Sequence, residues 1–244
     1  MAARLGDGAW TDLADAPTLV VVPVGSCEQH GPHLPLDTDT RIAVALAAGL
    51  ADALAASPAT PSSLPTARVA PAISITASGE HQGFPGTLSI GAAVTESVIV
   101  ELVRSADWSA GVVLVNGHGG NAGPVGRAVA QSLAEGRRVH SWWPRVPDGD
   151  AHAGRTETSL MLAIEPSVVR LGDAVAGRTE PIAALIDDLR ARGVRWVSPT
   201  GVLGDPAGAT ADEGRALLTT LVDDLVRSTR SWWSVAARPP ARRA

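Results

Sequence analysis

The chain has 244 residues, of which 45% are hydrophobic and 18% are charged, and its formal net charge is −5. This composition is typical of a globular protein and excludes an intrinsically disordered chain. The acidic balance, with no stripe of basic residues that could follow a phosphate backbone, argues against a nucleic-acid partner.

Cysteine usage and hydropathy indicate where the protein works. Cys27 is the single cysteine, so a disulfide within the chain is impossible, which fits a reducing compartment. The first residues lack the apolar core of a signal peptide, and the apolar runs fall short of the roughly 20 residues that a membrane helix needs. We therefore expect a cytoplasmic protein with no membrane partner.

The first half of the chain alternates between strand and helix patterns. Residues 18–24 form a continuous apolar, β-branched run, which predicts a strand buried on both faces. The Ala- and Leu-rich stretch 40–56 predicts a helix, and a Pro- and Ser-rich loop is expected at 57–66. A second strand is then predicted at 68–75, followed by an amphipathic helix at 94–106.

The second half continues the alternation. A third buried strand is predicted at 111–115, a helix at 124–135 and a fourth strand at 138–143. Further helices are predicted at 159–164, 181–192 and 211–230. Strands that alternate with helices indicate an α/β fold with a mainly parallel sheet covered on both faces. We find no internal repeat or linker, so we expect one catalytic domain at 1–235 and a disordered tail at 236–244.

Polar side chains gather just after each predicted strand. In parallel sheets the ligand binds beyond the carboxyl ends of the strands, so these groups can converge although they are far apart in the sequence. The clusters contain Glu28, His30 and Asp39; Glu80 and His81; His118; and His152 with Glu157.

The first cluster has a spacing that suits a shared site. If the chain is extended there, Glu28 and His30 point to one side, and Cys27 and Gln29 point away. Asp39 precedes the first predicted helix, so it is either a ligand or the N-cap of that helix.

The number of these groups predicts a metal centre with two ions. Metal binding needs carboxylates and neutral imidazoles within about 2.0–2.2 Å of the ion. The candidates are Glu28, His30, Asp39, His118 and Glu157, with His152 as a sixth. They exceed the needs of one tetrahedral zinc, whereas two ions bridged by a carboxylate would use three ligands each and support hydrolysis.

Other site types find no support in the sequence. No serine nucleophile elbow, phosphate-binding Gly-Lys loop or dinucleotide fingerprint is present. A lone histidine in a Gly-rich turn is usually a packing or capping residue, but His118 arrives where other ligands gather. We expect His33 and His81 to be supporting or loop residues, and His140 to be structural.

Four motifs together resemble the creatininase family of metal-dependent amidohydrolases. They are "GSCEQHGPHLPLDTD", "GEHQGFPGT", "NGHGGN" and "HAGRTETS", and the resemblance runs roughly from residue 18 to residue 215. It implies a three-layer α/β/α sandwich, two divalent metal ions per chain, hydrolysis of C–N bonds and a homo-oligomer. Mixed imidazole and carboxylate ligands suit zinc or iron(II), and also manganese.

The resemblance also implies a role for each matching residue. One ion would take Glu28, Asp39 and His118, and the other His30, Asp39 and Glu157, with Asp39 as the bridge. His152 would act beside the reacting water as acid or base, and Glu157 would share in catalysis.

One family position departs from the pattern. The creatininase motif has a carboxylate two residues after the ligand histidine, and here that position is Gly120. This departure argues against creatinine as the substrate.

The motifs are most similar to a peptidase subgroup of the family. That subgroup releases a modified C-terminal dipeptide derived from Val-Tyr from a small ribosomally made precursor peptide. The residues expected to bind the substrate are Ser78, Glu80, His81, Gly119, Gly120 and Arg155. Arg155 would pair with the carboxylate of a peptide, or else is a solvated surface arginine.

Two rival functions remain open from the sequence. One is another amidohydrolase of the family, acting on creatinine or on a formamide-type substrate. The other is a non-catalytic scaffold that binds a single structural metal. Counting the metal ions per chain would distinguish this scaffold from a two-metal hydrolase.

Overall fold

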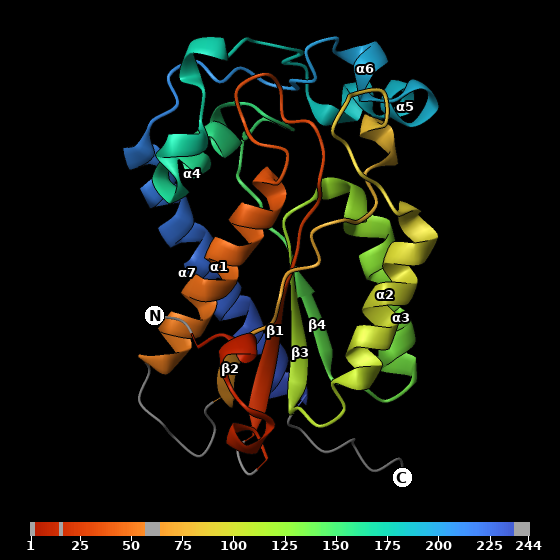
Figure 1. Cartoon of the computed structure of the whole chain (residues 1–244), viewed down its shortest axis with the longest axis vertical. Coiled ribbons are helices and arrows are strands. Elements are labelled where there is room, and N and C mark those ends of the chain that lie inside the picture. The colour runs from red at the N-terminus through yellow and green to blue at the C-terminus, as the bar shows by residue number, and fades with distance from the viewer. Residues whose placement is uncertain (1–2, 15–16, 57–63, 237–244) are drawn as a thin grey trace.

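A parallel sheet forms the centre of the computed structural model, which describes residues 3–14, 17–56 and 64–236 (Figure 1). In the described part of the chain the sheet has four strands in the order β2-β1-β3-β4, and every neighbouring pair is parallel. The strands are β1 (Thr18–Val24), β2 (Thr66–Val69), β3 (Gly111–Asn116) and β4 (Val139–Trp142).

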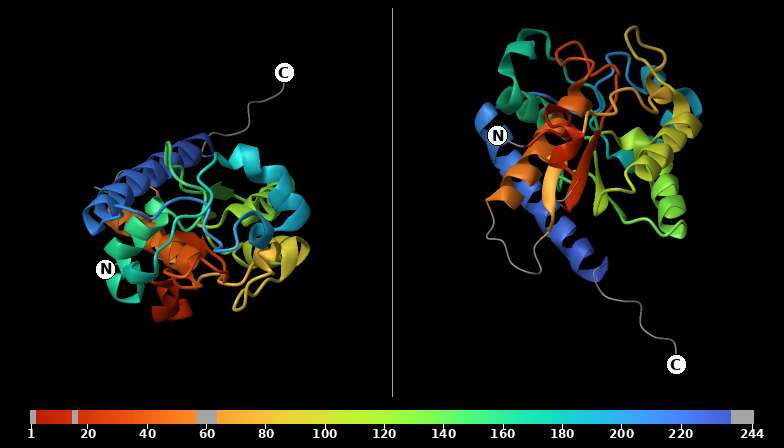
Figure 2. Two further views of the ribbon diagram at one scale, coloured as in Figure 1. Left: turned by 90° about the horizontal axis from the view of Figure 1, so that it is seen from above. Right: turned by 60° about the horizontal axis from the view of Figure 1, so that its bottom comes forward.

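Helices cover both faces of this sheet. Figures 1 and 2 show α1, α4 and α7 on one side and α2 and α3 on the other. The helices are α1 (Thr38–Ala55), α2 (Gly91–Ser105), α3 (Ala122–Ala134), α4 (Arg155–Ile164), α5 (Ile182–Arg192), α6 (Val194–Val197) and α7 (Ala211–Ala236). The predicted three-layer α/β/α sandwich is confirmed.

The position of β1 between two helical layers explains why its sequence is apolar without interruption. Leu19 and Val21 pack into the core beneath α1, α4 and α7. Val20 and Val22 point to the opposite face and pack beneath α2 and α3. Successive side chains of a strand alternate between faces, so a strand between two helical layers needs apolar residues at every position. The prediction of a strand buried on both faces is confirmed.

Several predicted boundaries were wrong, and two of them have identifiable reasons. The second strand ends at Val69 and not at 75, because the pairing with β1 shifts by one residue: Ala70 N–H donates to the Val21 oxygen, and the next donor to β1 is Ile73, which donates to the Pro23 oxygen. The helix predicted from 159 begins at Arg155, because the carboxylate of Asp150 accepts the backbone N–H groups of Arg155 and Thr156. This carboxylate satisfies donors that the first turn of a helix leaves unpaired.

The C-terminal part also differs from expectation. The last helix reaches Ala236 and so extends past the predicted end at 230 into the first residue of the predicted tail. The remainder of that tail, 237–244, and positions 57–63 of the predicted loop lie outside the described residues. In the described part of the chain, no helix is both long and apolar enough to cross a membrane.

The loops at the carboxyl ends of the strands face α4, α5 and α6, at the top of Figure 1. The short helix α6 was not predicted. With α5 it forms a small separate core around Leu185, Leu189 and Val197, against which Phe84 packs. This core connects the 79–87 loop to the segment 182–203 beside the candidate site.

Candidate metal centre

The loops after β1, β3 and β4 bring the predicted ligands together at the carboxyl end of the sheet. Among the residues that the structure describes, three sets of side chains each offer ligand atoms that lie within 4.8 Å of one another. The sets are Glu28, His30 and His152; Glu28, Asp39 and His118; and His30, Asp39 and Glu157. The last two sets share Asp39, and they coincide with the two triads that the family resemblance implies for the two ions.

Asp39 lies between these two triads and directs one oxygen to each. Its Oδ1 atom is 3.1 Å from His30 Nε2. Its Oδ2 atom is 3.1 Å from His118 Nδ1 and accepts a hydrogen bond of 2.7 Å from Ser26 Oγ. Asp37, not Asp39, occupies the N-cap position of α1, so the capping alternative for Asp39 is wrong. The carboxylate is buried in a bridging arrangement at the positive end of the helix dipole.

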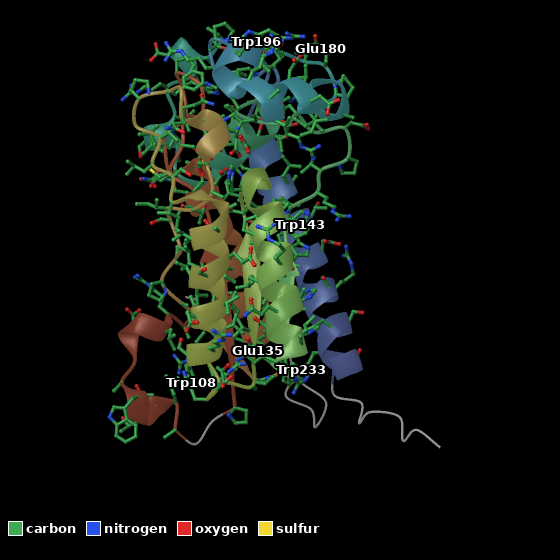
Figure 3. The ribbon with its side chains drawn as sticks, turned by 90° about the vertical axis from the view of Figure 1, so that its right-hand side faces the viewer. Trp108, Glu135, Trp143, Glu180, Trp196 and Trp233 are labelled. Atoms are coloured by element: carbon green, nitrogen blue, oxygen red, sulfur yellow. The ribbon has the colours of Figure 1, made fainter. Side chains whose placement is uncertain are left out.

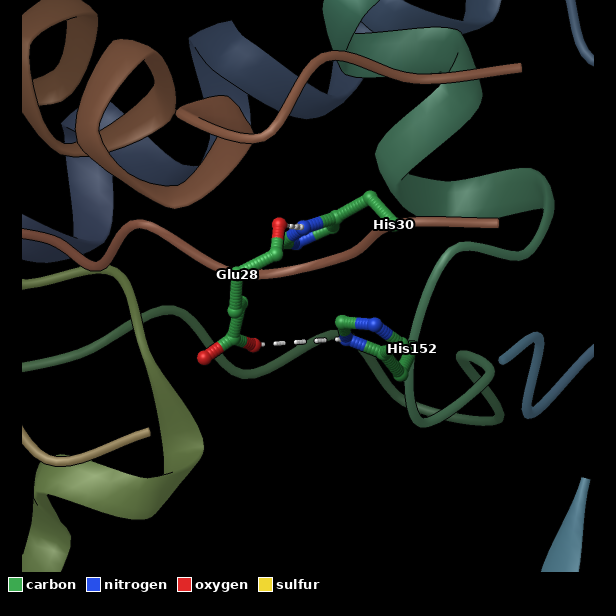
Figure 4. A group of neighbouring side chains, drawn as sticks. All are labelled: Glu28, His30 and His152. Atoms are coloured by element: carbon green, nitrogen blue, oxygen red, sulfur yellow. Dashed lines mark hydrogen bonds and ion pairs between the residues drawn. The ribbon is translucent and has the colours of Figure 1, made fainter. Parts of the chain in front are cut away.

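Backbone carbonyl groups orient the two imidazoles of these triads. His30 donates from Nδ1 to the backbone oxygen of Glu28 at 3.1 Å, which leaves Nε2 toward Asp39 (Figure 4). His118 donates from Nε2 to the backbone oxygen of Ala77 at 2.9 Å, which leaves Nδ1 toward Asp39. Metal-binding histidines have such a partner on the other ring nitrogen, because it fixes the tautomer and the ring direction.

Glu28 supplies the observation that tests the fit to a metal. It is fully buried, yet among the described residues neither of its carboxylate oxygens accepts a hydrogen bond. Imidazole nitrogens of His118 and His81 lie 3.2 Å and 3.3 Å from these oxygens without hydrogen-bond geometry. Figure 4 shows the carboxylate directed to His152, whose Nδ1 lies 3.8 Å away. A buried carboxylate without donors is costly, whereas a cation would satisfy it, so the residues fit a metal ion.

Without a cation, two imidazoles compensate the charge of the carboxylates. Burial alone would lower the pKa of His30, but the nearby Asp39 and Glu157 outweigh it and raise this pKa to about 10. Burial likewise opposes protonation of His118, yet Glu28 and Asp39 raise its pKa well above the usual value. Protonated imidazoles thus occupy the positions where positive charge is needed.

The two predicted catalytic groups have pKa shifts of another kind. Burial, together with the charges of His30 and His81, holds the pKa of His152 well below its usual value, so its ring is neutral. Burial raises the pKa of Glu157 to about 7, although His30 opposes this shift and about 20% of the side chain is exposed. A neutral imidazole and a carboxyl group that titrates near neutrality are suited to proton transfer.

The predicted substrate-binding residues fall into two places. Ser78, Glu80 and His81 lie in or just before the short 3-10 helix Gly79–His81, beside His118 and Glu28. Ser78 and His81 are buried, whereas the Glu80 side chain is 33% exposed. Gly119 and Gly120 lie in the turn after His118, and both are exposed.

Arg155 makes a contact outside this group of residues. Its Nε donates to both carboxylate oxygens of Glu213 on α7, at 2.9 Å and 3.0 Å. The arginine side chain is 53% exposed. A role in binding a substrate carboxylate would require this surface ion pair to exchange partners.

The space at Gly120 explains its departure from the family pattern. A Cβ atom added there would lie 2.2 Å from Glu80 Oε1 and 2.4 Å from His118 Nε2. Glu80 Oε1 itself lies 3.4 Å from His118 Nε2. A carboxylate from a different loop therefore occupies the space that a side chain at position 120 would need. The spacing of the motifs in the sequence does not indicate that Glu80 takes this space.

Gln29 was placed wrongly by the expectation of an extended chain. Its side chain does not point away, because the chain turns at Gly31 (φ 63°) and the N–H of Gly31 donates to Gln29 Oε1 at 2.9 Å. The buried amide lies 2.8 Å from His81 Nδ1. Cys27 does point away, toward the backbone oxygen of Gly86 at 3.7 Å.

The remaining histidines have structural contacts. His33 Nε2 lies 2.9 Å from Thr158 Oγ1, so this histidine connects the loop after β1 to α4. His140 lies 2.9 Å from Ser228 Oγ and stacks on Trp232 with ring centroids 5.4 Å apart. These contacts agree with the supporting and structural roles expected from the sequence.

Known proteins are similar in sequence to this chain along nearly its whole length. The family model described as "Creatininase: Creatinine amidohydrolase" matches residues 7–229. A "Mycofactocin precursor peptide peptidase" of Mycobacterium tuberculosis is 48% identical over 235 residues, which cover 94% of this chain and 91% of that protein. The protein of the same name from Mycolicibacterium smegmatis is 47% identical over 230 residues, covering 93% and 91%. A "Creatinine amidohydrolase" of Pseudomonas putida is 25% identical over 261 residues, covering 93% and 95%.

Solved structures show the same fold. A mutant creatininase described as Zn-Zn type has a TM-score of 0.79 at 21% identity, covering 96% of this chain and 99% of that chain. "Creatininase Mn" has a TM-score of 0.74 at 22% identity, with coverage of 96% and 99%. Because the family model spans most of the sequence and relatives share almost half of their residues with it, the chain belongs to the creatininase family.

Proposed function

We propose that this protein is a metal-dependent peptidase that removes the modified C-terminal dipeptide from the mycofactocin precursor peptide. The observation that carries the proposal is the bridging position of Asp39, whose Oδ1 faces His30 of one set of ligands and whose Oδ2 faces His118 of the other. Hydrolysis of an amide is the chemistry of such paired sites. The relatives at 47% and 48% identity support the choice of substrate.

Two divalent cations would be held by the triads that share Asp39. Glu28 and His118 would complete one triad, and His30 and Glu157 the other. Zinc and iron(II) suit these ligands, and manganese is a further candidate; the related structures described as Zn-Zn and Mn support zinc and manganese. Such cations, when bound, lower the pKa of water and stabilise negative charge on a carbonyl oxygen.

His152 would move the proton. Its Nε2 donates to the backbone oxygen of Gln29 at 2.8 Å, so the lone pair of the neutral ring is on Nδ1, which faces Glu28. That nitrogen can accept the proton of the attacking water and return it to the leaving amine. Glu157, whose pKa is raised to about 7, is the second group that can exchange a proton there.

The turn after His118 would orient the scissile carbonyl group. Gly119 and Gly120 carry no side chains and are exposed, so a peptide can approach their backbone N–H groups closely. Donors fixed before the reaction stabilise a developing oxyanion without reorganisation. Ser78, Glu80 and His81 line the same side of the centre and would contact the residues next to the cleaved bond.

Arg155 would take the terminal carboxylate of the peptide by exchanging its partner Glu213. Substitution of Arg155 by alanine is expected to raise the KM for a peptide with a free C-terminus, because a bidentate ion pair would be lost. The same variant should leave the KM for the C-terminal amide of that peptide unchanged. An unchanged KM for both peptides would assign Arg155 to the surface ion pair alone.

Two properties complete the proposal. We place the protein in the cytoplasm, where a single cysteine stays reduced. We also propose a homo-oligomer, as the family resemblance implies. Sedimentation of the zinc-loaded protein tests the second statement.

The test of function uses the zinc-loaded protein and the candidate precursor peptide. Mass spectrometry should detect a released dipeptide and the shortened peptide. Glu28→Ala and His118→Ala should lose both zinc and turnover, whereas Gln82→Ala, an exposed neighbour of His81, should retain both. Peptide cleavage that persists in the first two variants would overturn the site.

The rival functions give different results in the same assay. Turnover of creatinine or a formamide without peptide cleavage would indicate another amidohydrolase of the family. One tightly held ion per chain and no turnover would indicate a scaffold. The occupation of the space at Gly120 by Glu80, together with only 25% identity to the creatinine amidohydrolase of Pseudomonas putida, favours the peptide substrate.

A further inference from the structure

Gln29 is a buried polar side chain at the centre of the candidate site. Only 5% of it is exposed, and it lies between two histidines and the loop at Gly201. Its amide nitrogen is 2.8 Å from His81 Nδ1 and 3.1 Å from the backbone oxygen of Gly201. Neither of the two proposed metal triads contains it, and no step of the proposed reaction uses its side chain.

Two backbone groups fix which end of the amide is oxygen. The N–H of Gly31, which can only donate, lies 2.9 Å from Gln29 Oε1. The carbonyl of Gly201, which can only accept, lies 3.1 Å from Gln29 Nε2. Exchanging the two ends would oppose donor to donor and acceptor to acceptor, so the orientation is determined.

This orientation determines the tautomer of His81. The amide nitrogen has two hydrogens, and its acceptors are the Gly201 oxygen and His81 Nδ1. Since Nδ1 accepts, the ring proton of neutral His81 is on Nε2. That nitrogen lies 3.3 Å from Glu28 Oε1, so the ring proton of His81 is on the side of this carboxylate, although the two groups lack hydrogen-bond geometry.

The same count determines the tautomer of His152. Its Nε2 lies 3.1 Å from the Gln29 amide nitrogen and 2.8 Å from the Gln29 backbone oxygen. The backbone oxygen can only accept, so His152 Nε2 must carry a hydrogen and donate to it, and it cannot also accept from the amide. The lone pair of His152 is therefore on Nδ1, 3.8 Å from Glu28 Oε1.

We propose that Gln29 is a positioning residue that holds the ring proton of His81 on Nε2, beside the lone pair of His152. The two rings lie with centroids 4.6 Å apart and face the same carboxylate, one with an N–H and the other with a lone pair. Amide hydrolysis needs a proton acceptor and a fixed donor together. This inference rests on the proposed function for its catalytic meaning, although the tautomers themselves can be measured independently.

Gly201 is the second residue on which the orientation of the Gln29 amide depends. Its φ is +81°, which disfavours any residue with a side chain. A Cβ atom added there would lie 1.8 Å from Gln29 Oε1. A glycine is thus required for the loop after α6 to bring its carbonyl against the Gln29 amide.

The test measures the tautomer of His81 directly. Solid-state ¹⁵N spectra of the zinc-loaded, histidine-labelled protein distinguish protonated from unprotonated ring nitrogens, and a His81→Gln variant assigns the signal by difference. Wild-type protein should show His81 protonated on Nε2. In Gln29→Glu the carboxylate can only accept, so the proton of His81 should move to Nδ1. A Nδ1-protonated His81 in the wild type, or an unmoved proton in Gln29→Glu, overturns the proposal.

Activity and zinc content complete the experiment. Gln29→Glu should keep its zinc and lose about 10- to 100-fold in kcat, the range typical for residues that orient a metal site. Gln82→Glu makes the same change at an exposed position next to His81 and should match wild type in tautomer and in kcat. If Gln29→Glu does not fold, Gln29→Met removes the amide donor at similar volume, and a His81 ring that stays wholly Nε2-protonated there overturns the proposal. Failure of the wild-type protein to cleave the peptide would reject the proposed function but not the tautomer assignment.

Discussion

The two ends of the sheet both concentrate carboxylates, but they neutralise them differently. At the amino end, Arg104 pairs with Glu101 at 2.5 Å and with Glu135, and Arg137 pairs with Glu135 at 2.5 Å and with Asp107 at 3.0 Å. Figure 3 shows Glu135 near this end, with Trp108 and Trp233, far from Glu180 and Trp196. At the carboxyl end, in the described part of the chain, the ion-pair partners of Glu28 and Asp39 are imidazoles.

The difference explains why the groups at the amino end suit a structural role and those at the carboxyl end suit the proposed binding of cations. A guanidinium keeps its charge at any physiological pH, so the pairs at the amino end are complete in themselves. An imidazole can lose its proton and then bind a metal through the nitrogen that it frees. Burial sharpens the contrast, because Glu28 and Asp39 are almost fully enclosed whereas the pairs around Arg104 face solvent.

The largest effect should come from Asp39, because it serves both triads. Asp39→Asn keeps the shape of the side chain but removes the charge that faces His30 and His118. We expect loss of both ions and a fall in turnover of more than about 100-fold, beyond the range for residues that only orient ligands. Elemental analysis and peptide cleavage measure the two quantities.

Asp37→Asn is the matched control for that change. Asp37 lies two positions earlier and pairs with Arg41 at 2.7 Å on the partly exposed start of α1. Such a pair contributes little to stability, on the order of 0–1 kcal/mol. The control should keep its metal and its turnover. Equal losses in both variants would mean that Asp39 acts only through the helix.

A smaller loss of metal binding is expected when a single methyl group is added at position 120. In Gly120→Ala the added Cβ would meet His118 Nε2 at 2.4 Å and the backbone oxygen of Ala77 at 2.8 Å, so the ring of His118 must shift. We expect about a 10- to 100-fold loss of metal affinity. Gly119→Ala adds the same group where nothing lies within 4 Å and should bind metal as the wild type does. Equal affinities in the two variants would contradict the close packing around His118.

The contrast between guanidinium and imidazole also predicts the response to pH. In the metal-free protein the pKa of His30 is raised from 6.5 to about 10, so its proton stabilises the fold below pH 6.5 and this stability is lost as pH rises toward 10. The pKa of Glu157 is raised from 4.5 to about 7, so stability falls as pH rises through that range also. His152, whose pKa is lowered, opposes this trend below pH 6.5 and is neutral in both states above it. The metal-free protein should therefore become less stable from about pH 7 to pH 10.

Metal binding should show the opposite trend, because the cation must displace these protons. Each displaced proton makes the affinity about tenfold higher per pH unit. The unfolding temperature should be measured with and without a fixed excess of zinc, at pH 6 and at pH 8.5. Zinc should raise the unfolding temperature more at pH 8.5 than at pH 6. A gain that is equal or smaller at pH 8.5 would show that His30 and His118 do not give up protons to the metal.

The sequence was sufficient for the parts of the site that depend on local order. The apolar run of β1 and the alternation of elements place Glu28, His30 and His118 at the same edge, because parallel strands end together. The sequence also places Asp39 close to the start of the first helix, although the expected start at 40 is two residues late and Asp39 lies within the first turn of α1. These relations follow from the periodicity of strands and helices, which needs no tertiary information.

The sequence was insufficient where a contact depends on two distant loops. The inward position of Gln29 depends on Gly31 and on Gly201, which is 172 residues away. The position of Glu80 in the space beside Gly120 depends on how two separate strand ends approach each other. No pattern within one segment reports such contacts, and the same holds for the Arg155 and Glu213 pair across α4 and α7.

The smallest effect should come from the amino end, where the carboxylates already have permanent partners. Glu135→Gln removes a charge that pairs with both Arg104 and Arg137. Because these groups face solvent and are screened by salt, we expect the unfolding temperature to fall by no more than about 2 °C, and less at high salt. Zinc content and peptide cleavage should equal those of wild type. A loss of zinc in Glu135→Gln would show that the two ends of the sheet are coupled, and it would remove the distinction between a completed ion-pair cluster and a site built for a cation.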